Sequence, residues 1–225
     1  RQVGEGRLAG AARPHQRHHP SRKGREGDPL QSPATLLVSH PHVFELQLAA
    51  GAREANRILR SYRTGFRIEE DASQFDELTE RANAADVIHF SGHAVGDPRG
   101  YEPASIVLRN HGEERRIGVA EIAKLRLDRT AVVVLAGCGT ARGERRAAEG
   151  VISVAHGFLS AGVPSAVATL WPISDQSAAL FFPRLHEKLA AGLAPAEALR
   201  EVQLDAIRRG NVPASLWAAV QVIGS

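Results

Sequence analysis

The 225-residue sequence contains no methionine and a single cysteine, Cys138. One cysteine excludes an internal disulfide and a cysteine-rich metal site. It fits a reducing cytosol, in which a lone thiol stays available for chemistry, so we expect a cytoplasmic protein. Because the chain begins at Arg1 and lacks methionine, we expect a piece of a longer polypeptide, or a translation without its true start.

Long apolar segments are also missing. No run approaches the roughly 18–20 residues that a membrane-spanning helix needs, so we expect no membrane span. The first thirty residues lack the apolar centre of a secretory signal peptide. With 43% hydrophobic and 24% charged residues, the composition is that of a soluble globular protein.

The charge is unevenly distributed along the chain. Residues 1–34 hold seven basic and three acidic side chains, a net charge of +4, whereas the remainder holds 21 basic and 22 acidic ones, a net charge of −1. The first segment is rich in Gly, Pro, His and Arg without apolar periodicity, so we predict a disordered tail or linker over 1–34 and one domain over 35–225. A domain without its own basic excess argues against specific nucleic-acid binding.

From Leu36 onward, short apolar runs alternate with amphipathic stretches, which is typical of an α/β fold with a mostly parallel sheet. Residues 131–136 are apolar throughout, as in a central strand covered on both faces. We predict five or six strands flanked by helices. The expected strands are 36–39, 87–90, 105–108, 131–136, 165–170 and 218–223, and the expected helices are 52–62, 73–84, 150–161, 174–190 and 196–209.

Two of these strands run into loops that contain reactive side chains. The strand at 87–90 leads to His93, and the strand at 131–136 leads to Cys138 between two glycines. Functional residues of open α/β sheets gather beyond the carboxyl ends of the strands. If the two strands are parallel neighbours, both side chains emerge at one sheet edge, where an imidazole can activate the thiol. His89, within the first strand, is expected to pack inside the sheet.

These two loops resemble those of the CHAT domain, a branch of the caspase-like peptidases that also includes separase. The resemblance rests on Ile-His-Phe-Ser-Gly-His at 88–93 and on Val-Val-Val-Leu-Ala-Gly-Cys-Gly-Thr at 132–140. It continues in the same order to the end of the chain, through 149–151, the Leu-Trp-Pro segment within 161–175, 193–204 and 217–220. The fold that it implies is a caspase-like three-layer sandwich with a mostly parallel central sheet.

The resemblance implies a cysteine endopeptidase that acts on a protein or peptide substrate. Cys138 would be the nucleophile, His93 would protonate the leaving amine, and the N–H groups of Ala94 and Cys138 would form the oxyanion hole. Glu149 and Asp175 would face the substrate or cap helices. No metal and no organic cofactor is implied. CHAT domains often follow helical repeats or sensor modules that regulate them, and such a partner would lie outside this chain.

Three positions depart from the family pattern. Gly137 and Gly139 flank the cysteine where alanine and an acidic or amide residue are usual, and Ala94 replaces a glycine after the histidine. They keep open an alternative, a catalytically inactive CHAT-type interaction or scaffold domain. Separases, which cut after arginine, carry an acidic residue a few positions beyond the match to Asp175. Residues 177–180 contain none here, which argues against assuming arginine specificity.

Two other interpretations of the same residues fail on spacing. A zinc site of His89, His93 and Cys138 would place the histidines across a strand and a loop instead of on one helical face. A dinucleotide site at 137–143 has its third glycine displaced by one residue and lacks the acidic residue that would bind a ribose. The polar segment 140–146 has no apolar anchor, so we expect it to be mobile and to be ordered by a partner or ligand.

Overall fold

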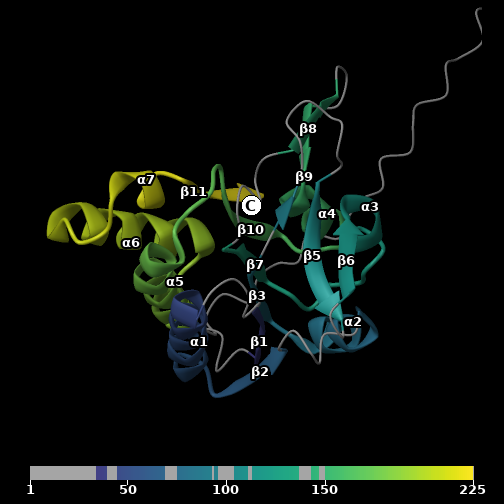
Figure 1. Cartoon of the computed structure of the whole chain (residues 1–225), viewed down its shortest axis with the longest axis horizontal. Coiled ribbons are helices and arrows are strands. Elements are labelled where there is room, and N and C mark those ends of the chain that lie inside the picture. The colour runs from purple at the N-terminus through teal and green to yellow at the C-terminus, as the bar shows by residue number, and fades with distance from the viewer. Residues whose placement is uncertain are drawn as a thin grey trace, which may run out of the picture.

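The centre of the fold is a six-stranded sheet with helices on both faces (Figure 1). The computed structural model describes residues 34–39, 45–68, 75–92, 94–95, 104–110, 113–136, 143–146 and 150–224. The strand order is β11-β10-β7-β3-β1-β2, with β11 antiparallel to β10 and the other neighbours parallel. The strands are β1 (Ala34–Ser39), β2 (Thr64–Ile68), β3 (Val87–Ser91), β7 (Val132–Leu135), β10 (Ser165–Thr169) and β11 (Val220–Gly224).

Seven described helices form the outer layers (Figure 1). The helices α1 (Glu45–Arg60), α5 (Asp175–Ala190), α6 (Pro195–Arg209) and α7 (Ala214–Trp217) lie on one side of the sheet. On the other side lie α2 (Phe75–Ala84), α3 (Val119–Ile122) and α4 (Val154–Ser160). The predicted α/β fold with a mostly parallel central sheet between helices is therefore confirmed.

The alternation of side chains along the strands gives the sheet two apolar faces. Val132 and Val134 of β7 join the core under α1, α5 and α6, whereas Val133 and Leu135 join the core under α2, α3 and α4. All four side chains are at most 3% exposed. Burial on both faces explains why this strand is a continuous apolar run in the sequence.

Two small antiparallel sheets accompany the central one. The first has the order β4-β5-β6, with β4 (Ala94–Val95), β5 (Ser105–Asn110) and β6 (Glu113–Gly118). The strand predicted at 105–108 therefore exists but does not join the central sheet, because it pairs locally with the strand that follows it. The second pairs β8 (Gly143–Arg146) with β9 (Gly150–Ser153). Part of the segment expected to be mobile is thus a paired strand, since backbone pairing needs no apolar side chain.

The prediction of one helix over 150–161 is wrong in its first turn. Residues 150–153 form β9, and α4 begins at Val154. Two β-branched residues, Val151 and Ile152, favour the strand. Ser153 then ends it: its backbone N–H donates to Nδ1 of His156 at 3.4 Å, as part of a capping box. The strand β2 was not predicted, because only two of its five residues, Phe66 and Ile68, are apolar, and Phe66 is 43% exposed.

Helix α5 contains a proline, Pro183, in its interior. Proline has no N–H, so the carbonyl four residues earlier, that of Ala179, lacks its helical donor. The guanidinium of Arg57, on α1, donates to this carbonyl at 3.4 Å. The interruption in α5 therefore becomes a polar contact between α1 and α5.

Candidate active site

The strands β3 and β7 end side by side at one edge of the sheet. They are parallel, and Phe90 lies opposite Leu135 in their register. One residue beyond the strand, the N–H of Ala136 donates to the carbonyl of Phe90 at 2.8 Å. The predicted neighbourhood of the two strands is therefore confirmed. The side chains that this edge was predicted to carry, those of His93 and Cys138, lie outside the described residues, as does Glu149.

Ala94 is held in the small sheet beside this edge. It is the first residue of β4, lies opposite Ile106 of β5, and is half-buried. Ala94 was predicted to offer its N–H to the oxyanion together with the N–H of Cys138. The pairing of β4 with β5 holds the backbone of Ala94 within a sheet, and the oxyanion role of Ala94 stays a prediction.

The third strand at this edge is β10, on the other side of β7. It is parallel to β7, with Ala168 opposite Leu135. Trp171 follows β10 with its side chain 36% exposed, and its indole N–H donates to the carbonyl of Ser215 at 2.6 Å. This bond ties the segment that follows β10 to α7. The sheet order thus places β7 between the strand that leads to His93 and the strand that leads to Trp171.

Asp175 opens α5 just beyond β10, and its side chain is exposed. Ser174, directly before it, is the helix cap, and its Oγ accepts from the N–H of Ser177 at 3.3 Å. A carboxylate in the first turn also interacts favourably with the helix dipole. Of the two roles predicted for Asp175, helix stabilisation has this direct structural basis, and a substrate contact stays a prediction.

Below the edge, His89 is fully buried against α1 and α5, which confirms that it packs within the fold. Its Nδ1 lies 2.9 Å from Nε2 of His186 on α5, and Nδ1 of His186 lies 2.7 Å from the hydroxyl of Tyr62. On the other side, Nε2 of His89 lies 3.5 Å from Oε1 of Glu54 on α1. These four side chains, Tyr62, His186, His89 and Glu54, are named the buried polar chain below.

Two features of the buried polar chain matter for its chemistry: His186 is neutral, and the contact between His89 and Glu54 is not a hydrogen bond. Burial, and secondarily the nearby His89, lowers the pKa of His186 well below its usual value, so this ring is neutral near pH 7. Within the described part of the protein, Oε1 of Glu54 and Nε2 of His89 have no hydrogen-bond partner, although they face each other. Sequence reasoning missed Glu54, Tyr62 and His186.

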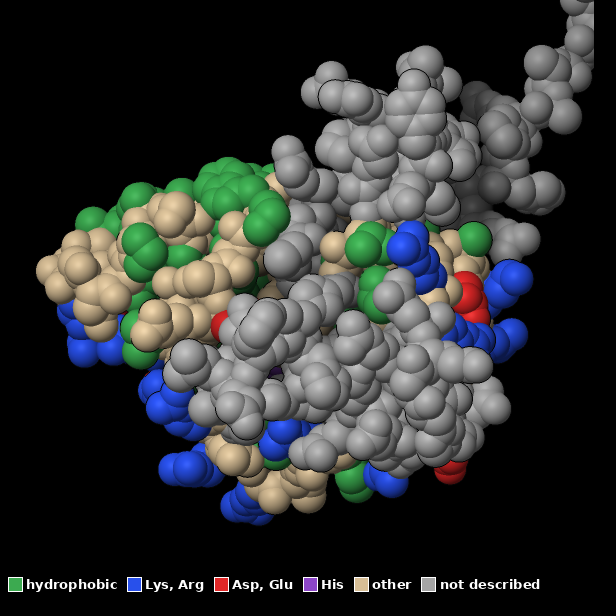
Figure 2. Space-filling model, in the orientation of Figure 1, with side chains coloured by type: hydrophobic (Ala, Val, Ile, Leu, Met, Phe, Trp, Pro, Cys, Tyr) green, Lys and Arg blue, Asp and Glu red, His purple; other side chains and the backbone are tan. Residues whose placement is uncertain are grey.

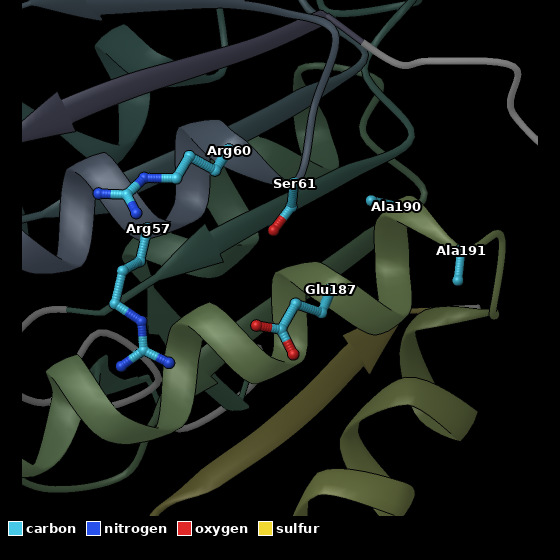
Figure 3. A pocket seen from close by; sticks show the side chains of 6 residues that line it. All are labelled: Arg57, Arg60, Ser61, Glu187, Ala190 and Ala191. Atoms are coloured by element: carbon cyan, nitrogen blue, oxygen red, sulfur yellow. The ribbon is translucent and has the colours of Figure 1, made fainter.

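Two hollows lie on the helical layer, away from the carboxyl edge of the sheet. One, of about 490 Å³, is lined by Arg57, Arg60, Ser61 and Glu187 together with Ala190 and Ala191 (Figure 3). The other, of about 610 Å³, shares Arg57 and Glu187 and extends over α6. Figure 2 shows Lys and Arg side chains along this side of the molecule. The first hollow lies at the C-terminal ends of α1 and α5, where cations are favourable without any ligand.

The described residues contain no group of three or more His, Cys, Asp or Glu side chains placed to hold a metal ion. Among these same residues, no helix is long and apolar enough to cross a membrane.

Comparison with protein families decides where the chain belongs. The model of the CHAT domain matches residues 7–225. The chain is a member of the CHAT domain family. The match covers nearly the whole sequence, which agrees with the resemblance seen in the residues around His93 and Cys138. No curated protein matches this CHAT chain.

Solved structures show the fold of this CHAT domain. The separase–securin complex of Saccharomyces cerevisiae aligns with a TM-score of 0.59 at 15% identity, over 87% of this chain and 12% of that one. RgpB of Porphyromonas gingivalis, in a complex of its pro- and mature domains, aligns with a TM-score of 0.55 at 11% identity, over 85% of this chain and 47% of that one. Both are caspase-like cysteine peptidases. The CHAT chain spans only a small part of separase and about half of RgpB, so the likeness shows a caspase-like fold.

Proposed function

We propose that this CHAT domain is a cysteine endopeptidase whose nucleophile is Cys138 and whose acid–base residue is His93. The observation that supports it is the parallel pairing of β3 with β7, which end together at the carboxyl edge of the sheet. His93 follows β3 by two residues and Cys138 follows β7 by three. Catalytic residues of open α/β sheets concentrate at this edge.

The proposed chemistry is acyl transfer. The thiolate of Cys138 attacks the carbonyl carbon of a peptide bond, and the N–H groups of Cys138 and Ala94 stabilise the oxyanion that forms. Collapse of this intermediate breaks the C–N bond, and His93 supplies the proton to the leaving amine. Water then attacks the thioester and releases the second product together with the thiol. A Cys–His dyad needs no third residue for these steps.

Regulation by a protein partner is part of the same proposal. In the neighbouring structure of separase, the peptidase is in a complex with securin. We infer that a sensor or repeat module outside this chain acts on the loop between β7 and β8, which contains Cys138. The hairpin of β8 with β9 supports this idea, because it gives such a partner a structured element next to the cysteine loop.

The single cysteine makes the test of the dyad direct. Any thiol label on this protein reports on Cys138 alone. In the proposed dyad, iodoacetamide alkylates Cys138 near pH 7 about 10–30 times faster than an ordinary thiol of pKa about 8.5, because more of it is thiolate. His93→Ala removes this excess, whereas His156→Ala, which replaces an exposed histidine on α4, leaves it unchanged.

Turnover is tested separately with a peptide library. Cys138→Ala and His93→Ala each abolish cleavage, and the double variant is no worse than either single one, because the two residues act as a unit. A wild-type thiol with ordinary reactivity and no cleavage of any peptide would instead support the alternative, an inactive CHAT-type interaction domain. Cleavage that persists in Cys138→Ala would place the nucleophile elsewhere.

A further inference from the structure

The buried polar chain joins three elements of the fold just below the candidate active site. Glu54 comes from α1, Tyr62 from the turn after it, His186 from α5 and His89 from β3. The exposed fractions are 2% for Glu54, 8% for Tyr62 and 0% for each histidine. Around it, this side of the sheet is packed with apolar side chains such as Phe182, whose ring lies edge-on to His89 at 5.8 Å.

The hydrogen bonds of the buried polar chain have a direction, from donor to acceptor, whereas the apolar contacts around them have none. A neutral imidazole has one N–H donor and one acceptor nitrogen. If Tyr62 donates to Nδ1 of His186, then Nε2 of His186 donates to Nδ1 of His89, and the proton of His89 faces Glu54. Reversing one link reverses the next. Hydrogen bonds tolerate only small changes in distance and angle, whereas apolar contacts constrain position weakly.

Because His89 lies in β3, its hydrogen bonds act on the strand that leads to the carboxyl edge of the sheet. His89 is the last residue of β3 whose side chain makes these polar contacts, and His93 follows four residues later, within about 13 Å of extended chain. The ladder between β3 and β7 ends at Phe90 and Leu135, and the N–H of Ala136 adds one further bond. On its other side, β3 pairs with β1 as far as Ser91, so pairing fixes the strand within the sheet. The distance of β3 from α1 and α5 is set by the side chains that lie between them.

We propose that His89, held by His186 and facing Glu54, is a positioning residue that sets the placement of His93 relative to Cys138. This inference rests on the proposed dyad. It acts through the backbone of β3, so His89 itself touches no substrate. The expected effect is large, because a displacement of about 1 Å can cost about 100-fold in the rate of a catalysed step.

The test separates hydrogen bonding from packing by measuring the alkylation rate of Cys138 with iodoacetamide against pH in the full chain. His89→Phe keeps a ring in the core but removes both nitrogens. We expect the midpoint of the pH profile to rise by about one unit and the rate at pH 7 to fall by up to about tenfold, because a misplaced His93 no longer stabilises the thiolate.

Two further variants separate the effect of packing from that of hydrogen bonding, because one keeps the apolar bulk and loses the bond, and the other loses bulk and keeps the bond. The double variant His89→Phe/His186→Leu removes both rings of one bond, so neither ring keeps a nitrogen that has lost its partner in that bond, and its pH profile stays shifted. His89→Asn loses ring contacts and stability, but its amide oxygen accepts from His186, and its profile stays close to that of the wild type. Val202→Ala, an apolar truncation in the same core, lowers stability without moving the profile.

Circular dichroism establishes that each variant is folded, and the double variant carries the test if His89→Phe alone does not fold. A wild-type pH profile in the double variant overturns the positioning role, because it would show that packing alone suffices. So does a profile that follows thermal stability through all variants, Val202→Ala included. If the alkylation rate of Cys138 does not change in His93→Ala, the proposed dyad is wrong. If it does change, but the pH profile stays that of the wild type in every His89 variant, only the positioning role of His89 is wrong.

Discussion

The two faces of the central sheet are built from the same strands but packed in different ways. The face under α2, α3 and α4 has a core of apolar side chains, including Ile88, Phe90 and Leu135, and none of the buried histidines or carboxylates among the described residues lies in it. The face under α1, α5 and α6 has a core of similar size into which Glu54, His89 and His186 are inserted. The first face is stabilised by the hydrophobic effect, which is strong and non-directional. The second adds contacts that specify one arrangement of two helices and a strand.

The difference predicts that the apolar face contributes most to stability per residue and least to pH dependence. Leu127→Ala, a truncation of a fully buried side chain on that face, should lower the free energy of unfolding by about 2–5 kcal/mol. The loss should be the same at pH 5.5 and 7.5, because no ionisable group changes its surroundings. Urea unfolding at both pH values measures it, and a loss that differs between them by more than about 1 kcal/mol would contradict the contrast between the two faces.

On the polar face, breaking the chain should cost less than removing apolar bulk. His186→Leu removes the ring that bonds to the hydroxyl of Tyr62 and to Nδ1 of His89, and the loss of these two hydrogen bonds should lower the free energy of unfolding by about 1–3 kcal/mol. Adding Tyr62→Phe removes the hydroxyl that has lost its bond to His186 and should recover part of this loss. Urea unfolding of the single and double variants tests it, and a double variant less stable than the single one would show that the bond is not the source of the loss.

The pH dependence of stability should belong to the polar face. The pKa of His186 is lowered in the folded protein, whereas in the unfolded chain it returns to about 6.5. Below that pH the unfolded chain binds a proton that the folded protein does not, so the free energy of unfolding falls as the pH drops. The slope is at most about 1.4 kcal/mol per pH unit for this group. His186→Leu should flatten the dependence between pH 6.5 and 5, and Val202→Ala should not; an equal slope in both variants would assign it to other groups.

The smallest expected effect is that of the cap of α5. Ser174→Ala removes the oxygen that accepts from the N–H of Ser177, at a cost of about 1 kcal/mol. This variant weakens the helix that carries His186 without touching the buried polar chain. The melting temperature should therefore fall by a few degrees, while the pH dependence keeps its wild-type slope. A changed slope would mean that His186 responds to any loosening of α5.

The part of the site that sequence could predict follows from local pattern. The short apolar runs at 131–136 and 87–90 predict two strands, and parallel order places their ends together, as the register of Phe90 with Leu135 confirms. The dyad at their ends stays a prediction, because His93 and Cys138 lie outside the described residues. The α/β fold was likewise predictable from the alternation of strands and helices.

The buried polar chain could not be predicted in the same way. In the sequence, His89 and His186 are 97 residues apart, and Tyr62 and His186 are 124 residues apart. No local pattern encodes such a contact. One signal was present: His186 lies in the same helical stripe as Phe182 and Leu189, where a polar residue is unusual. A histidine within the apolar stripe of one element and another within a buried strand are candidates for a pair.

The proline of α5 has a consequence for how the helical layer is assembled. The carbonyl of Ala179, which Pro183 leaves without its helical donor, accepts from the guanidinium of Arg57, and this bond links one turn of α1 to one turn of α5. Sliding α1 along α5 by a single turn would carry the cation about 5.4 Å away from its acceptor. The same slide would carry Glu54, one turn earlier on α1, away from His89. The proline that interrupts α5 thus helps to fix the position of α1 along the helix axis.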